Sequence, residues 1–489
     1  MKKFTIKHKL LVAVLSVTVL LCGMFGLQAV ADNVEADYTV AQDSILNEIP
    51  LYTYGGDYVQ TYSCGASGKY YEKDGVTQFG EDVTDNLDGG EMLVFENVTS
   101  ASSFNNYREA LESFGYMFYN DNQLDGNLFA TYVTEETVVT VSYLDNLNQL
   151  NILAEPMRAM PGLEEENVYE NLKVENKAVI MTCGYIGNSN GMCIAYQLCD
   201  GSFLLFDSGY GYGYHEGSDK ANKNPDFVNY WQNQAKEIYR TLEKMSAEAG
   251  LDKIVIAGWF FGHPHWDHIG GFIPFGDLYE QKVAEGKLKV EKVIFNWPNQ
   301  ETLQEMIYPK GQKMSHYIVL IQESAAKLGA VEVEAHAGQT FYIRDAVIDV
   351  LCTWEEQTEW SDSWTSINEG NSGTVFSLEL GGERIMMLSD CGKSSTETML
   401  DLYSADFLKS DVLQVAHHGY NAFTKPLNDK VDPDVVLWTN DSLSSGALSD
   451  NFTNVPDRDR IYHNADRITL VNLPYTGEVE YWQCEFPRK

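Results

Sequence analysis

The chain has 489 residues, of which 44% are hydrophobic and 21% are charged. This composition is typical of globular proteins and excludes collagen-like, coiled-coil and wholly disordered chains. The 71 acidic residues outnumber the 34 basic residues, so the formal net charge is -37. Such a chain repels polyanions at long range, which disfavours nucleic acid as a partner without excluding a local basic groove.

The first 31 residues have the pattern of a secretory signal peptide. Four lysines within residues 2–9 precede an apolar run over residues 10–27, and the small residues 29–31 suit signal peptidase. We expect cleavage after Ala31 and a protein that is secreted by a bacterial cell or associated with its surface; an uncleaved anchor is the alternative. No second long apolar run follows, so we expect no transmembrane span in the mature chain.

The next part of the chain predicts a spacer and a small α+β domain. Residues 32–50 are polar and lack periodicity, whereas residues 51–160 contain helical and strand patterns. Residues 104–114 have the apolar spacing of a helix, and residues 128–133 and 137–143 read as strands. The many Tyr and Asn residues are compatible with a carbohydrate- or wall-binding module, but a structural or interaction module is the stronger interpretation.

Residues 177–489 predict a layered α/β domain, because short β-branched runs alternate with stretches of helical spacing. Residues 156–176 before it are acidic and loop-like, as at a domain boundary. The predicted strands cover residues 178–182, 192–198, 203–206, 253–257, 290–295, 331–334, 346–351, 375–380, 385–388 and 412–415. The predicted helices cover residues 227–249, 299–308, 316–328 and 395–407. Functional sites in such domains lie at strand ends.

One such strand end is rich in metal-binding residue types. Directly after the strand at residues 253–257, three histidines and an aspartate lie within six residues, namely His263, His265, Asp267 and His268. This clustering is improbable by chance, because the chain has only 10 histidines. A loop can aim His263 and His265 at one metal ion while Asp267 and His268 reach another. Imidazole nitrogen and carboxylate oxygen suit Zn²⁺, and oxygen-rich sets also admit Mn²⁺ or Fe²⁺.

The His-x-His-x-Asp-His pattern resembles the hallmark of the metallo-β-lactamase superfamily. Residues 203–209 resemble the family's strand that ends in Asp-Ser-Gly, in which Asp207 supports the metal loop. Residues 385–390 resemble the later strand whose last residue, Asp390, bridges two metal ions. The resemblance implies a four-layer αββα sandwich over residues 177–489.

A fourth segment of the family closes the predicted site. Residues 412–419 are similar to the His-His-Gly segment in the hydrolase domain of the DNA-uptake protein ComEC. Both His417 and His418 are therefore candidate ligands. Adjacent residues on a strand point to opposite faces, so we expect one to bind metal and the other to contact substrate or support a ligand. Of the two, His417 is the preferred ligand.

The family's third histidine for the first metal ion is missing. Lactamase and glyoxalase relatives carry it before the hairpin that ends in the bridging aspartate, where this chain has Asn371-Ser372-Gly373-Thr374. The ComEC-like branch also tends to have Asn and Ser there, so Asn371 is a candidate oxygen ligand or substrate contact. His336, after the strand at residues 331–334, is the other candidate, with a surface or capping histidine as the alternative.

The resemblance implies hydrolysis with two divalent ions. Such ions lower the pKa of a bridging water from about 15.7 towards roughly 7, so hydroxide becomes available to attack a phosphoryl or carbonyl group. Asp267 would both bind metal and orient the nucleophile. Such metal-assisted chemistry needs no serine nucleophile.

The substrate is predicted from weaker patterns. The His-His-Gly and Asn-Ser segments look like the nuclease and phosphorylcholine-esterase side of the superfamily, which favours a phosphodiester, a phosphorylated small molecule, or a wall or lipid head group. The acidity of the chain disfavours a long polyanion. A lactonase or carboxylic-ester hydrolase of the same fold is one alternative, and a non-catalytic metal-containing binding protein is another. The sequence does not indicate an oligomeric state.

Overall fold

The computed structural model describes residues 38–42, 44–64, 68–71, 78–83, 90–157, 164–165, 173–181, 191–209, 232–297, 315–356, 373–419, 425–440, 459–462 and 467–486. Of the described residues, those at 40–50 and from 54 onwards belong to one compact unit, and those at 38–39 and 51–53 belong to another. The predicted signal peptide, the predicted helix at 299–308 and Asn371 lie outside the described residues. Within the described ranges, no helix is both long enough and apolar enough to cross a membrane.

The predicted small α+β part is present as a helix on an antiparallel sheet. The sheet order is β1-β4-β8-β7-β6-β5. These strands are β1 (Asp57–Cys64), β4 (Gly90–Glu96), β8 (Gln149–Pro156), β7 (Thr137–Leu144), β6 (Asn127–Val133) and β5 (Met117–Leu124). A separate hairpin pairs β2 (Gly68–Tyr71) with β3 (Gln78–Val83).

Helix α2 (Ala101–Phe114) has clear start and stop signals. The side chain of Ser100 accepts a hydrogen bond from the N–H of Ser102, and Gly115 ends the helix in the left-handed conformation at φ 112°. Its buried residues include Phe104, Tyr107 and Leu111, whose spacing places them on one face. The predicted helix on a sheet is therefore confirmed.

The rest of the chain forms two larger sheets. The first has the order β16-β15-β13-β12-β11-β10-β24-β25, and β14 pairs with β13. Its strands are β16 (Val331–Glu334), β15 (Lys292–Phe295), β14 (Leu288–Val290), β13 (Ile254–Phe260), β12 (Phe203–Phe206), β11 (Ile194–Gln197), β10 (Lys177–Ile180), β24 (Arg467–Asn472) and β25 (Val479–Gln483). Every residue of β11, β12 and β13 is buried, which accounts for sequences that are apolar apart from Gln197.

The second large sheet has the order β23-β22-β21-β20-β19-β18-β17-β9. Its strands are β23 (Asp459–Tyr462), β22 (Val435–Trp438), β21 (Val412–Gln414), β20 (Glu383–Met387), β19 (Val375–Leu380), β18 (Ala346–Cys352), β17 (Thr340–Ile343) and β9 (Glu164–Glu165). Strands β20, β21, β22 and β23 run parallel to one another, so their carboxyl ends meet at one edge.

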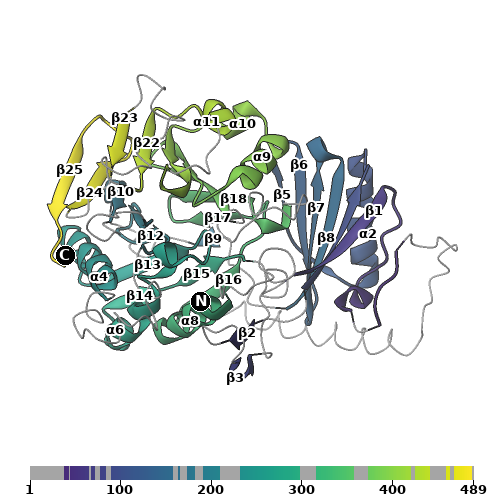
Figure 1. Ribbon diagram of the computed structural model, residues 1–489, viewed down its shortest axis with the longest axis horizontal. Coiled ribbons are helices and arrows are strands. Elements are labelled where there is room, and N and C mark those ends of the chain that lie inside the picture. Colours follow the sequence, from purple (N-terminus) through teal and green to yellow (C-terminus); the bar gives the residue numbers. More distant parts are fainter. Residues whose placement is uncertain are drawn as a thin grey trace, which may run out of the picture. The chain divides into compact units, whose positions relative to one another are not determined.

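Three apolar cores separate four layers. The first core joins one face of the first sheet to α4 (Asn233–Glu248), α6 (Ile273–Ala284) and α8 (Ser315–Leu328). The second lies between the two sheets, and the third joins the second sheet to α9 (Lys393–Leu402), α10 (Ala405–Leu408) and α11 (Lys425–Val431). Figure 1 shows these two helix groups on opposite outer sides of the sheets. The predicted αββα sandwich is therefore confirmed.

Some predicted elements differ in their bounds. The run at 290–295 contributes to two strands, because β14 ends at Val290 and β15 begins at Lys292. The predicted helix at 395–407 is divided, because α9 ends before Tyr403 and Ser404 caps the start of α10. The acidic segment 156–176 contains the short strand β9, which pairs with β17. These differences depend on pairing partners and caps that apolar spacing does not encode.

The six-stranded sheet and the sandwich share contacts within the same compact unit. The amide of Asn127 donates a hydrogen bond of 2.9 Å to the carbonyl of Leu402. The amide of Asn122 donates one of 2.7 Å to the hydroxyl of Thr340. The ring of Phe129 also lies against Gly338, where an added Cβ would overlap it. Polar and apolar contacts together therefore attach the sheet to the sandwich.

Candidate metal centre

The candidate residues lie at the carboxyl ends of parallel strands. Strands β12 and β13 run parallel in the first sheet, and Asp207 and His263 follow their ends. Strands β20 and β21 run parallel in the second sheet, and Asp390 and the pair at 417–418 follow theirs. The sandwich thus brings segments up to about 210 positions apart to one edge, as expected for a site in an α/β fold.

Asp207 and Ser208 hold the histidine-rich loop in place. The Asp207 carboxylate lies 2.6 Å from Nδ1 of His268 and accepts a hydrogen bond of 2.8 Å from the N–H of Gly262. The Ser208 hydroxyl donates a 2.8 Å hydrogen bond to the carbonyl of His268 and accepts one of 2.9 Å from the N–H of Phe272. Both ends of the loop are therefore attached to the end of β12. The role of Asp207 in supporting a metal site stays a prediction.

The buried Asp390 carboxylate lies between two groups of imidazoles. Its Oδ1 atom lies 3.2 Å from Nε2 of His268 and 3.4 Å from Nε2 of His418. Its Oδ2 atom lies 3.5 Å from Nε2 of His263 and 3.8 Å from Nε2 of His417. Each carboxylate oxygen therefore faces its own pair of histidines.

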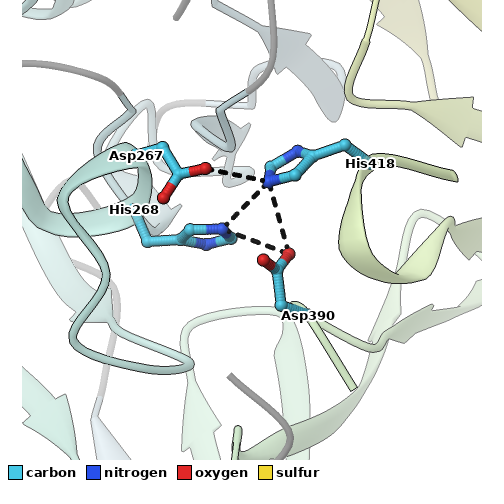
Figure 2. A group of neighbouring side chains, drawn as sticks. All are labelled: Asp267, His268, Asp390 and His418. Atoms are coloured by element: carbon cyan, nitrogen blue, oxygen red, sulfur yellow. Dashed lines mark hydrogen bonds and ion pairs between the residues drawn. The ribbon is translucent and has the colours of Figure 1, made fainter. Parts of the chain in front are cut away.

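The described residues contain two clusters of closely spaced ligand atoms. His263, His265 and Asp390 form the first group, and Asp267, His268, Asp390 and His418 form the second. Within each group, one ligand atom from every residue lies within 4.8 Å of the others. Figure 2 shows the four side chains of the second group pointing towards one another. The structure thus brings together these six predicted ligands, while their binding of metal stays a prediction.

The two neighbouring histidines do not lie on a strand, which corrects the expectation that they point to opposite faces. Strand β21 ends at Gln414, and His417, His418 and Gly419 all have left-handed backbone conformations, with φ of 48°, 54° and 80°. Such a turn directs both side chains towards Asp390. His418 is the buried one and belongs to the second group, whereas the half-buried His417 faces the first group. The preference for His417 alone is therefore not supported by this geometry.

The imidazole of His418 also has polar contacts on its Nδ1 side. Its Nδ1 atom lies 3.2 Å from the carbonyl oxygen of Thr439, and the amide of Asn440 donates a 3.2 Å hydrogen bond to the carbonyl of His418. Both residues follow β22, which is parallel to β21. A donor–acceptor contact at Nδ1 directs Nε2 towards the carboxylates, as in metal sites with a second layer of hydrogen bonds.

His336 lies in a different buried cluster. Its Nε2 atom lies 3.1 Å from the carboxylate of Glu155 on β8, and its Nδ1 atom lies 3.0 Å from that of Glu355. Both ring nitrogens therefore face carboxylates, and His336 is not part of either group around Asp390. The expectation that it completes the first group is not supported by its position. Asn371 lies outside the described residues.

The carboxylates of the site raise the pKa of two of its histidines. Burial opposes protonation of His268, but the Asp390 and Asp207 carboxylates raise its pKa well above the usual range. Burial likewise opposes a charge on His418, yet its pKa is raised to about 9 by Asp390 and Asp267. Burial and the neighbouring imidazoles hold the pKa of His263 well below the usual range, so its ring is neutral.

The donor atoms at the centre suit a divalent cation. Nε2 of His263 is buried without a hydrogen-bond partner among the described residues. Unpaired polar atoms of this kind are rare in folded proteins, because burying them without a partner costs free energy. A cation bound by imidazole nitrogens and carboxylate oxygens would remove that cost, and this is the donor set of many Zn²⁺ sites. The residues present therefore fit the predicted metal pair.

Several residues of the site were not predicted as functional. The carbonyl of Gly262 accepts hydrogen bonds from the N–H of Thr374 at 2.9 Å and from the indole of Trp297 at 3.3 Å. The hydroxyl of Ser389 contacts Nδ1 of His263 at 3.0 Å, and Gln414 hydrogen-bonds to the Ser389 backbone. Most of these residues lie at or just after strand ends, and that position is the one signal by which the sequence could have singled them out.

Comparisons with solved structures return metallo-β-lactamase-fold proteins. The metallo-beta-lactamase fold protein YhfI from Bacillus subtilis is 12% identical, with a TM-score of 0.34; the match covers 63% of this chain and 100% of that one. A HARLDQ-motif mutant of a metallo-beta-lactamase from Cronobacter sakazakii is 14% identical, with a TM-score of 0.24, over 49% and 79% of the two chains. CmlA, a diiron beta-hydroxylase from Streptomyces venezuelae, is 11% identical, with a TM-score of 0.31; the match covers 62% of this chain and 55% of CmlA.

No family model matches the sequence, and no curated protein matches it. At the identities and TM-scores given above, similarity to the three structures says nothing about activity. The fold assignment rests instead on the two large sheets, their helices and the apolar cores between these layers. The chain is an αββα sandwich with a histidine- and aspartate-rich centre at its strand ends.

Proposed function

We propose that this protein is a metal-dependent hydrolase whose centre holds two divalent cations, with Zn²⁺ preferred and Mn²⁺ or Fe²⁺ as alternatives. The observation that carries the proposal is the position of Asp390, whose two oxygens each face a separate pair of buried or half-buried imidazoles. A carboxylate placed in this way suits a bridge between two cations.

The proposed ligands divide between the two groups. His263 and His265, with His417 beside them, would hold the first cation; Asp267, His268 and His418 would hold the second. When bound, such a pair supplies an activated water as the nucleophile and polarises an oxygen of the substrate. Asp267, whose carboxylate lies 3.3 Å from Nε2 of His418, would orient that water and accept its proton.

We propose a small phosphodiester, a phosphorylated small molecule, or a phosphorylated wall or lipid head group as the substrate. The resemblance of the His-His-Gly turn to the ComEC-like branch supports phosphoester chemistry. The net charge of -37 supports a small substrate over a long polyanion, whose binding would require many basic contacts. The signal-like pattern over residues 1–31 supports action outside the cell.

The proposal is tested with protein that has been stripped of metal by a chelator and then titrated with Zn²⁺ or Mn²⁺. We expect about two bound ions per chain and metal-dependent cleavage of bis(p-nitrophenyl) phosphate, with slower cleavage of p-nitrophenyl acetate and a lactone. Faster cleavage of the ester or lactone would instead identify the carboxylic-ester alternative. Two bound ions without turnover on any substrate would identify a binding protein, and failure to bind ions would refute the metal centre.

A further inference from the structure

We propose that Ser389, held by Gln414, is a positioning residue for His263 and sets the affinity with which the first group of ligands binds its cation. This inference rests on the proposed function, because it concerns how the same centre is built. Ser389 is buried and lies directly before Asp390, in the turn that follows β20.

The backbone of Ser389 is unusual for its residue type. Its φ is 49°, in the left-handed region that glycine adopts freely and other residues adopt rarely. A glycine would satisfy this turn with less strain. A serine at this position is therefore expected to contribute something that glycine lacks, which is its hydroxyl group.

The hydroxyl group contacts the histidine directly. Oγ of Ser389 lies 3.0 Å from Nδ1 of His263, on the side of the ring away from Asp390. On the other side, Nε2 of His263 lies 3.5 Å from Oδ2 of Asp390. When the hydroxyl accepts a hydrogen bond from Nδ1–H, the lone pair of the neutral ring is on Nε2, where a cation would take it. Because a hydroxyl can also donate, the contact sets the direction of the ring, and it leaves Nε2 available to a cation when Nδ1 carries the proton.

The loops that carry these two residues are in direct van der Waals contact. A Cβ added to Gly262, the residue before His263, would overlap Oγ and Cβ of Ser389. Only glycine therefore allows the histidine loop to approach the β20 turn this closely. The short distance between Oγ and the imidazole depends on this close packing.

Gln414 holds the peptide groups on both sides of Ser389. Its buried side-chain oxygen accepts hydrogen bonds from the N–H groups of Leu388 at 2.8 Å and Ser389 at 2.7 Å. Its amide donates one of 3.2 Å to the carbonyl of Ser389, which also accepts one of 3.0 Å from the N–H of His417. One carboxamide therefore connects the turns that carry Asp390 and His417, and it keeps the serine in its left-handed conformation.

The second group has a different support. Nδ1 of His268 contacts Asp207 rather than Ser389. Asp207 also accepts a hydrogen bond from the N–H of Gly262, but the partner at Nδ1 differs between the two imidazoles, a hydroxyl for His263 and a carboxylate for His268. Removing the hydroxyl or the carboxylate is therefore expected to lower the affinity for a different cation in each case.

The test is a Co²⁺ titration of the metal-free protein, followed by visible absorption and by calorimetry. The wild type is expected to bind two ions. Ser389→Gly keeps the turn and removes the hydroxyl. This variant is expected to bind one ion about 10- to 100-fold more weakly and the other ion with unchanged affinity. Asp207→Asn is expected to lower the affinity for the other ion, the one held by the second group, with a different spectral change. Ser410→Ala removes a buried hydroxyl that bonds to the carbonyl of Leu408, outside the site, and is the matched control.

The outcomes separate the two proposals. If the wild type binds two ions and Ser389→Gly binds both with unchanged affinity and spectrum, the role of Ser389 is refuted and the metal centre stands. Equal weakening of both ions, together with a lower melting temperature, would show that Ser389 only stabilises the fold and would also refute its positioning role. Absence of Co²⁺ binding in the wild type would overturn both proposals.

Discussion

At the scale of single residues, Asp390 has the greatest influence on the charge of the centre. Burial opposes its ionisation, yet the surrounding histidines, led by His268 and His418, hold its pKa well below the usual range. The carboxylate is therefore charged throughout the physiological range. Both of its oxygens face imidazoles, so neither group keeps its geometry without it.

Asp390→Asn is expected to lower metal-dependent hydrolysis by at least about 100-fold, because an amide neither carries the charge nor bridges two cations. Initial rates with bis(p-nitrophenyl) phosphate and the metal content of the dialysed variant measure the effect. Asp406→Asn, on an exposed residue of α10, is the matched control. Full activity in Asp390→Asn with two bound ions would contradict the proposed bridge.

The adjacent histidines are expected to differ in importance. His418 is buried within the second group, whereas His417 is half-buried and its Nε2 lies 3.8 Å from Asp390. His418→Ala is expected to lower activity by about 100-fold or more and His417→Ala by roughly tenfold, because the first is enclosed by two carboxylates. Parallel rate measurements at saturating Zn²⁺ provide the comparison. A larger loss in His417→Ala would reverse the assignment.

At the scale of elements, the site depends on how tightly the turns after the strands pack. The β13 loop, the β20 turn and the β21 turn meet through Gly262, Ser389 and Gln414. Left-handed residues concentrate here, including Asp207, Ser389 and His417. Strained conformations of this kind are kept where the surrounding contacts over-determine them, which is common at functional sites.

Gly262→Ala is therefore expected to be destabilising. Its Cβ would overlap the Ser389 side chain, so the two turns must separate, at a cost of about 1–3 kcal/mol in the free energy of unfolding. Urea unfolding of the metal-free protein measures this cost. Gly126→Ala is the control, because its Cβ would meet Asp145 only at an ordinary distance of 3.4 Å. Equal stability of the two variants would show that the turns can relax.

At the scale of the whole molecule, a buried cluster of charges joins the six-stranded sheet to the sandwich. Glu155 on β8 and Glu355 beyond β18 flank His336, and Glu356 lies next to them. Burial opposes a charge on His336, but the two flanking carboxylates raise its pKa well above the usual range. Burial, together with Glu355, raises the pKa of Glu356 to about 8. Both groups therefore bind protons more tightly in the folded chain than in the unfolded chain.

These shifts predict that the free energy of unfolding falls as the pH rises. Glu356 makes its full contribution to the free energy of unfolding below its unfolded pKa of about 4.3. This contribution is lost as the pH rises through about 8, with a slope of at most about 1.4 kcal/mol per pH unit. The contribution of His336 is complete below about pH 6.5 and is lost at a higher pH.

Glu356→Gln tests this dependence. The amide oxygen can still accept the hydrogen bond that the N–H of Thr353 donates at 2.8 Å, but the side chain no longer titrates. We expect a shallower slope in urea unfolding of the metal-free variant, measured at one-unit steps across the window from about pH 5 to about pH 8. Asp252→Asn, at an exposed pair with Lys287, is the control. An unchanged slope in Glu356→Gln would contradict a proton on Glu356 in the folded state.

The sequence alone determined the fold class and the identity of most candidate ligands. Strands at 203–206, 331–334 and 375–380 were predicted with their observed bounds, because a buried strand is a short apolar or β-branched run that can be read locally. The residues from His263 to His268 are close in sequence and were recognisable for the same reason.

Tertiary structure alone decided which side chains meet. Ser389 contacts His263 across 126 positions, and His336 pairs with Glu155 instead of joining the metal centre. The left-handed turn that directs His417 and Asp390 towards each other is also absent from any local pattern. Such contacts depend on how two sheets pack and where their strands end, whereas apolar periodicity describes only one element at a time.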